Sequence, residues 1–140
     1  MNHSLSSIRW LRVLSAALAV IALSFLIVTV IVAVYAFVLA FQARGAPDQS
    51  AISHFAARVS PQLMPWLEGA LTFLAAVIVA RRAGKASATH GLFIGILAGL
   101  FSLAVPLAFA GRLGLRSWVL FLIVVGLGWV GGLVGRKGTN

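Results

Sequence analysis

Few residues of this chain have side chains that could do chemistry. The sequence contains two acids, Asp48 and Glu68, three histidines, His3, His54 and His90, and no cysteine. A paired-carboxylate site needs two acids that meet, and a zinc centre needs three or four ligands, but these residues fall in different connections of the chain. We therefore predict no catalytic residue, no metal site and no cofactor, and we expect that the protein is not an enzyme.

Glu68 is the acid that most needs an explanation. About 20 Å of helix would separate it from the basic residue Arg81, so in a hydrocarbon core of about 30 Å its carboxylate would lie below the outer surface. A carboxylate there needs a partner or a proton, and Arg112 or Arg116 could form an intramembrane ion pair with it. One hypothesis is a proton- or cation-linked site. The preferred interpretation is structural: Pro65 opens a helix and Glu68 complements its positive end.

His90 precedes a glycine where a helix is expected to enter the membrane. An imidazole at this place could ligate a pigment or haem. Beside a basic turn, however, a histidine more often hydrogen-bonds lipid headgroups or carbonyls. We prefer this second interpretation and keep ligation as the alternative.

The elements that must position these residues are apolar helices. Hydrophobic residues make up 61% of the chain and charged residues 9%, which is too little polar surface for a water-soluble fold. About 20 apolar residues cross a bilayer as a helix, and four segments reach this length: about 11–41, 63–80, 90–111 and 117–135. The sequence predicts a single domain over residues 1–140, an all-α, polytopic transmembrane four-helix bundle.

The first segment is longer than a bilayer requires, because no charged residue stands between Val13 and Ala43. We expect this helix to tilt or to extend beyond the membrane. A cleaved signal peptide is the alternative, but its apolar region would be only about 7–15 residues long. A retained helix is therefore preferred.

A short amphipathic helix is predicted over residues 48–60. Ile52, Phe55 and Val59 recur at helical spacing, and Pro47–Asp48 and Ser60–Pro61 are typical boundaries. We expect this helix to lie on the outer membrane surface, either as a connector that covers the helix ends or as a docking surface for a partner.

Small residues recur every four positions in three of the expected helices. This spacing puts them on one helix face, where another backbone can approach closely. The candidate helix-packing residues are Gly91, Gly95, Gly99, Gly128, Gly132, Ala76 and Ala80. They would pack helices within one subunit or, alternatively, bring copies of the chain together.

Basic residues set the expected orientation and the expected lipid contacts. With the N-terminus inside, the outer side holds Arg44, Arg58, Arg112 and Arg116, and the inner side holds Arg9, Arg12, Arg81, Arg82, Lys85, Arg136 and Lys137. This excess favours cytoplasmic N- and C-termini in a multi-pass protein of the inner (cytoplasmic) membrane. We expect anionic headgroups to contact the inner group. No nucleic-acid partner is expected despite the net charge of +9, because no extramembrane domain is foreseen.

The residues 75–84 (AAVIVARRAG) and 90–97 (HGLFIGIL) resemble the central hairpin of small uncharacterised bacterial membrane proteins with four helices. The shared pattern is a helix rich in small residues, a basic turn, and His-Gly followed by apolar residues. About 30 residues carry the resemblance, and the long first helix and the segment 48–60 have no counterpart in it. The resemblance implies the architecture and brings no activity with it.

Two classes of function remain after these observations. The first is a non-enzymatic structural or accessory subunit that packs against a larger membrane complex through its glycine-rich faces. The alternative is a small homo-oligomeric transporter or channel that uses Glu68. Polar residues expected at mid-membrane depth are few, namely Ser24, Thr29, Thr72 and Ser102, and none of them is ionised. We therefore favour the accessory subunit.

Overall fold

The structure, a computed structural model, is all-helical. It describes residues 10–83, 87–110 and 113–137, and the side chains of Ala83, Val105, Pro106, Phe109, Ala110 and Lys137 are not among those described. The helices are α1 (Trp10–Ala43), α2 (Gln49–Ala83), α3 (Ser87–Ala110) and α4 (Leu115–Lys137). By length and composition, all four can cross a membrane, which confirms that part of the expected architecture.

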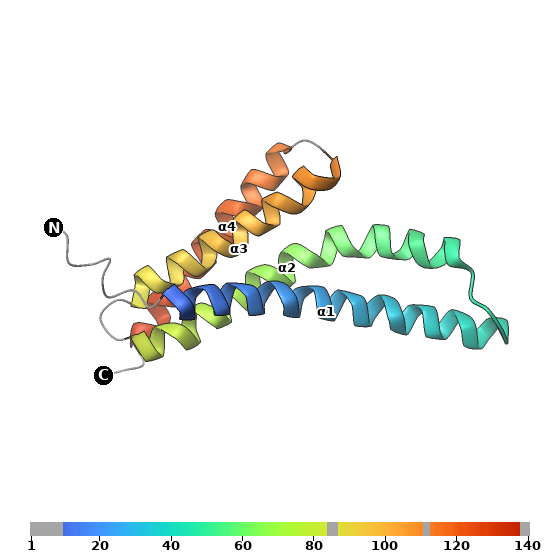
Figure 1. Ribbon diagram of the computed structural model, residues 1–140, viewed down its shortest axis with the longest axis horizontal. Coiled ribbons are helices and arrows are strands. Elements are labelled where there is room, and N and C mark those ends of the chain that lie inside the picture. Colours follow the sequence, from blue (N-terminus) through green and yellow to red (C-terminus); the bar gives the residue numbers. More distant parts are fainter. Residues whose placement is uncertain (1–9, 84–86, 111–112, 138–140) are drawn as a thin grey trace.

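The four helices form two antiparallel hairpins, α1–α2 and α3–α4 (Figure 1). The hairpins lie together where α1 and α3 begin and where α2 and α4 end, and we call this the basic end. From there they diverge, and we call the opposite end the split end. The α1–α2 hairpin reaches farther than the α3–α4 hairpin. At 1.5 Å per residue, the 34 residues of α1 span about 50 Å, whereas the 24 residues of α3 span about 36 Å.

The turn between α1 and α2 is closed by local hydrogen bonds. The amide of Gly45 donates to the Ala40 carbonyl (3.3 Å), and the amide of Arg44 donates to the Phe41 carbonyl (3.4 Å). This is the pattern of a Schellman motif, which places one residue in the left-handed region. Arg44 occupies that position with φ 51°, so α1 ends firmly after Ala43.

The segment 48–60 does not form the separate short helix that its periodicity and its flanking prolines predict. It is the first part of α2, which continues through Pro61 and Pro65 to Ala83. Proline removes one helical hydrogen bond and tends to bend a helix, and Figure 1 shows that the two halves of α2 run in different directions. The prolines therefore bend this helix, and the boundary placed at Ser60–Pro61 was wrong.

In the half of α2 nearer the split end, the apolar face packs against α1. The rings of Phe55 and Tyr35 stack with their centroids 3.9 Å apart. Ile52, Ala56 and Val59 are also partly buried on this face. The periodicity that indicated a surface helix is thus explained by contact with α1.

The hairpins meet through small clusters of apolar side chains. Val13 of α1 and Ile94 of α3 are both fully buried in one cluster. Val20 of α1 packs with Ala98 of α3 and Val124 of α4 in a second cluster, closer to the split end. These contacts hold the first half of α1, nearer the basic end, against the α3–α4 hairpin.

Glycines allow α3 and α4 to approach at backbone distance. A methyl group added at Gly128 would lie 2.8 Å from the Gly95 Cα, and one added at Gly132 would lie 3.0 Å from the Ala88 Cα. A methyl group at Gly91 would collide with the Gly128 carbonyl oxygen, and one at Gly99 would lie 2.8 Å from the Phe121 ring. At Gly91, Gly128 and Gly132 the near atoms are backbone, so no side chain would fit there without moving one helix.

A second close contact joins α4 to α2. A methyl group on Gly131 would lie 2.9 Å from the Cβ of Ala76, and one on Gly135 would meet the Cβ of Ala80. Ala76 and Ala80 are fully buried. The small residues singled out on α2, α3 and α4 therefore face neighbouring helices of the same chain.

Candidate functional site

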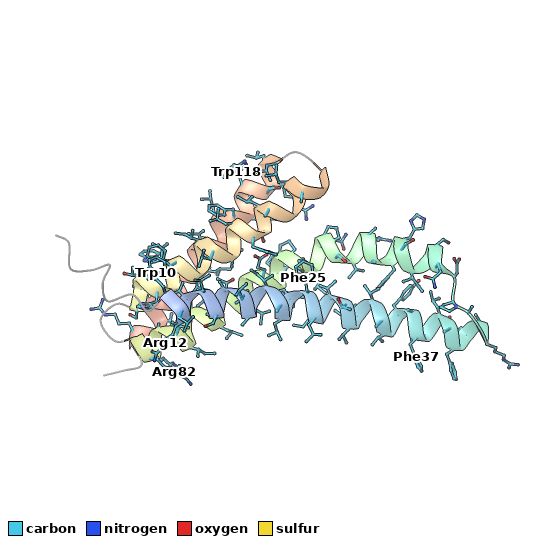
Figure 2. All side chains as sticks on the ribbon, in the orientation of Figure 1. Trp10, Arg12, Phe25, Phe37, Arg82 and Trp118 are labelled. Carbon is cyan, nitrogen blue, oxygen red and sulfur yellow. The ribbon has the colours of Figure 1, made fainter. Side chains whose placement is uncertain are left out.

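A cavity of about 800 Å³ lies where the two hairpins diverge, and all four helices contribute to its wall. The apolar part of the wall includes Ile21, Phe25 and Val28 of α1, Met64 of α2 and Leu120 of α4. Figure 2 shows Phe25 in the central region, where the α1–α2 hairpin meets the α3–α4 hairpin. A volume of this size is typical of sites that enclose a small organic ligand.

Glu68 of α2 is the acid in this cavity wall. Its side chain is only 6% exposed, and the hydroxyl of Ser102 on α3 donates a hydrogen bond to its Oε2. An ionisable group in apolar surroundings is costly unless it has a partner, and in membrane proteins it commonly marks a functional position. The α2–α3 contact thus supplies Glu68 with one polar partner inside the cavity.

Arg116 of α4 lies in the cavity wall toward the split end. Its guanidinium donates a hydrogen bond to the Pro61 carbonyl of α2 (3.4 Å). This carbonyl would normally accept from the amide four residues later, but that residue is Pro65, which has no N–H. Arg116 therefore satisfies a carbonyl that the second proline leaves free, and it ties α4 to the bend of α2.

Glu68 and Arg116 each hydrogen-bond another group in place of the ion pair considered above. Glu68 accepts from the hydroxyl of Ser102, whereas Arg116 donates to a backbone carbonyl about two helical turns nearer the start of α2. Arg112 lies outside the described residues. The cavity thus has a buried carboxyl group and, separately, a guanidinium group toward the split end.

Two aromatic residues of the cavity wall, Phe25 and Phe101, were not recognised in the sequence. Their side chains are 44% and 42% exposed although each lies in a helix that packs against others, because both rings border the cavity. Nothing in the periodicity of α1 or α3 distinguishes these rings from lipid-facing ones. The free carbonyl of Pro61, to which Arg116 donates, could be predicted from the sequence. Two prolines four residues apart within one helix leave the carbonyl of the first without its backbone donor.

The other polar residues expected at mid-depth lie near this region without forming a second site. Ser24 donates to the Val20 carbonyl of its own helix (2.8 Å), and Thr29 borders the cavity. Thr72 is fully buried, and its hydroxyl has no hydrogen-bond partner among the described residues. His90 is 2% exposed at the start of α3, where it belongs to the packed interior.

Basic side chains gather at the basic end from three helices. Arg81 and Arg82 lie in the last turn of α2, and Arg136 lies in the last turn of α4. Arg12 lies in the first turn of α1. Figure 2 shows Arg12 and Arg82 at this common end. Lys85 lies outside the described residues, and the side chain of Lys137 is not described.

The described residues include no group of three or more His, Cys, Asp or Glu side chains that could hold a metal ion. Comparison of the chain with protein-family models, with curated proteins and with solved structures finds no match.

Proposed function

We propose that this chain is a non-enzymatic integral membrane protein that serves as a structural or accessory subunit, and that its partner packs along the exposed face of α1. The observation that carries the proposal is the length and exposure of that face. Apolar side chains stay exposed along the helix at intervals of three or four residues, namely Leu11, Leu14, Leu18, Ala22, Leu26, Val30, Val34, Phe37 and Phe41.

The part of α1 beyond the α3–α4 hairpin supports a protein partner in particular. Phe37 is 72% exposed and Phe41 is 79% exposed, although Tyr35 and Phe55 pack against each other in the same stretch. Figure 2 shows Phe37 pointing away from α2. Since a helix of about 50 Å exceeds a hydrocarbon core of about 30 Å, the lipid tails alone do not cover its full length.

In this proposal the glycine faces pack helices within the chain, the first of the two alternatives given for them, and they do not contact the larger complex. Gly91, Gly95 and Gly128 already meet a helix of the same chain, and so do Gly131 and Gly135. They serve to hold α2, α3 and α4 together. The surface offered to a partner is therefore α1, which is free of glycine.

The orientation proposed for this subunit follows from its charges. The basic end, with Arg12, Arg81, Arg82 and Arg136, would face the cytoplasm and contact anionic headgroups of the inner membrane, each residue contributing about 1 kcal/mol. The split end carries Arg44, Arg58 and Arg116.

Photocrosslinking along α1 in native membranes tests the proposed partner surface. A photoreactive amino acid at the exposed positions Leu18, Leu26 or Phe37 should give one discrete adduct to a different protein chain. An adduct to a second copy of this chain would favour the homo-oligomeric alternative instead. The same amino acid at the buried positions Val20 and Val28 should give none. Adducts to lipid alone at the exposed positions would contradict the proposal.

A second candidate function is a small homo-oligomeric transporter or channel. The observation that favours it is the buried carboxyl group of Glu68 in the wall of the 800 Å³ cavity. Flux through proteoliposomes that contain only this chain, lost in Glu68→Gln, is the test of this candidate. Flux that is absent, or equal in the two proteins, would count against it.

A further inference from the structure

The cavity between the hairpins combines features that together specify a class of ligand. Its wall is mainly apolar, with aliphatic side chains of α1 and α4, Met64 and two prolines of α2, and the rings of Phe25 and Phe101. Five hydroxyl residues also border it: Ser24, Thr29, Ser60, Ser102 and Ser117. Of the described residues in the wall, Glu68 and Arg116 are the ionisable ones. A ligand that fills this space must therefore be largely apolar and must suit one buried carboxyl group.

The carboxyl group favours a positive charge within the cavity. A carboxylate in apolar surroundings is stable only beside a counter-charge or several hydrogen-bond donors, and Glu68 has the hydroxyl of Ser102 as its donor. The guanidinium of Arg116 is directed to the Pro61 carbonyl instead. A counter-charge for Glu68 is thus a role that a ligand can fill.

The aromatic rings favour a large cation with its charge spread over organic groups. Cations are attracted to the faces of aromatic rings, and the attraction is stronger when water is excluded. Metal ions prefer several carboxylate or carbonyl oxygen ligands, whereas the described wall offers one carboxyl group with hydroxyl groups beside it. An anion would be repelled by the carboxylate of Glu68, while the guanidinium of Arg116, which attracts anions, is held toward the split end by the Pro61 carbonyl.

We propose that the cavity between the two hairpins binds a monovalent lipophilic organic cation, whose charge lies beside the carboxylate of Glu68 and whose apolar groups contact Phe25, Phe101 and the aliphatic wall. This inference rests on the second candidate function, since it names the ligand that such a transporter would carry. Binding itself does not depend on transport.

Proton competition is a consequence of this arrangement. A proton and the organic cation neutralise the same carboxyl group, so the ligand's affinity falls as the pH is lowered and Glu68 becomes protonated. Arg116 is the other ionisable residue among those described in the wall. Binding of the cation to protonated Glu68 releases one proton.

Two probe ions of nearly equal size and opposite charge test the proposal on the purified full-length protein. Equilibrium binding of tetraphenylphosphonium should be saturable and should weaken at low pH, whereas tetraphenylborate should not bind. Glu68→Gln should weaken tetraphenylphosphonium binding by about tenfold or more, which corresponds to at least about 1.4 kcal/mol. Asp48→Asn is the matched control, because it removes the other acid of the chain, outside the cavity, and should leave binding unchanged.

Two results would overturn the proposal: equal binding of the two probes by the unaltered protein, and equal affinity of Glu68→Gln and the unaltered protein for the cation. The comparison of probes needs no variant, so it holds even if Glu68→Gln does not fold. Ser102→Ala offers a milder change and should weaken binding less than Glu68→Gln does. Binding of the cation without flux in proteoliposomes would support this inference and contradict the transporter function.

Discussion

At the scale of single residues, the closest contacts of the molecule are those that involve glycine. Gly95 of α3 meets the backbone of α4 at Val124 and Val125, and Gly128 of α4 meets Gly91 and Gly95. Such contacts gain dispersion energy only while the side chain stays absent, and a core that is already close-packed has little room to relax. The spacing of α3 and α4 therefore depends on these positions.

Gly95→Ala should destabilise the protein, because the added Cβ would lie 2.9 Å from the Val125 Cα and 3.0 Å from the Val124 carbonyl oxygen. Overpacking of this kind costs about 1–3 kcal/mol. Gly126→Ala is the matched control within α4, since nothing lies within 4 Å of the Cβ position there. We expect it to be neutral or slightly stabilising. Unfolding in mixed detergent micelles measures both, and equal stability of the two variants would refute the contact.

Glu68 illustrates which part of the site could be predicted from the sequence. An acid that follows Pro65 and precedes an uncharged run must enter the membrane region, so its unusual position was foreseeable. Its partner was not, because the hydroxyl of Ser102 stands 34 residues away on another helix. Which faces of α2 and α3 meet depends on how the helices rotate and bend, and local periodicity does not determine that.

At the scale of elements, α2 departs most from its expected form. The four apolar helices could be located from composition and length, because about 20 uncharged residues have few other stable forms in lipid. Pro61 and Pro65 predict helix boundaries, but α2 continues through both. A tertiary contact, the hydrogen bond from Arg116 to the Pro61 carbonyl, compensates one of the lost backbone bonds. The sequence alone does not predict this hydrogen bond, because it joins residues 55 positions apart on different helices.

The start of α2 is fixed by Asp48. Its Oδ1 accepts hydrogen bonds from the Ser50 hydroxyl (2.7 Å), the Ser50 amide (2.8 Å) and the Ala51 amide (3.4 Å). These bonds, led by that from the Ser50 side chain, lower the pKa of Asp48 below 3.8. Asp48 is thus the N-cap of the helix, where an anion also complements the helix dipole.

The cap should make the start of α2 sensitive to acid. Because the pKa of Asp48 is lower in the folded protein than in the unfolded chain, its carboxylate stabilises the fold above the unfolded-chain value. That contribution is lost as the pH falls through the folded-state pKa. The amide chemical shifts of Ser50 and Ala51 should therefore titrate below pH 3.8 and stay flat in Asp48→Asn, which caps without a charge. Titration above pH 3.8 would contradict the cap.

At the scale of the whole molecule, the divergence of the hairpins shapes both proposals. The hairpins share the contacts of α1 with α3 and of α2 with α4 near the basic end, and they separate toward the split end (Figure 1). The separation produces the cavity that contains Glu68. Toward the split end, α2 is the described helix that packs against α1. One geometric feature thus underlies the ligand site and the partner surface.

The proposed orientation predicts where reporters will be active. A reporter fused after Asn140 should be active only in the cytoplasm, and one inserted between Gly45 and Pro47, in the turn joining α1 and α2, only outside it. The charge difference between the ends is the physical reason. The opposite pattern of activity would reverse the orientation and move the basic end to the outside.

The most direct test of the central proposal, that α1 packs against a protein partner, is native mass spectrometry of the complex released from membranes in mild detergent. We predict one assembly of fixed stoichiometry that contains a different protein chain beside the 14.7 kDa one. Phe37→Arg should dissociate it, because a charge would then lie in an apolar contact, whereas Trp118→Arg on the exposed surface of α4 should not. A 14.7 kDa monomer that carries only lipid would contradict the account.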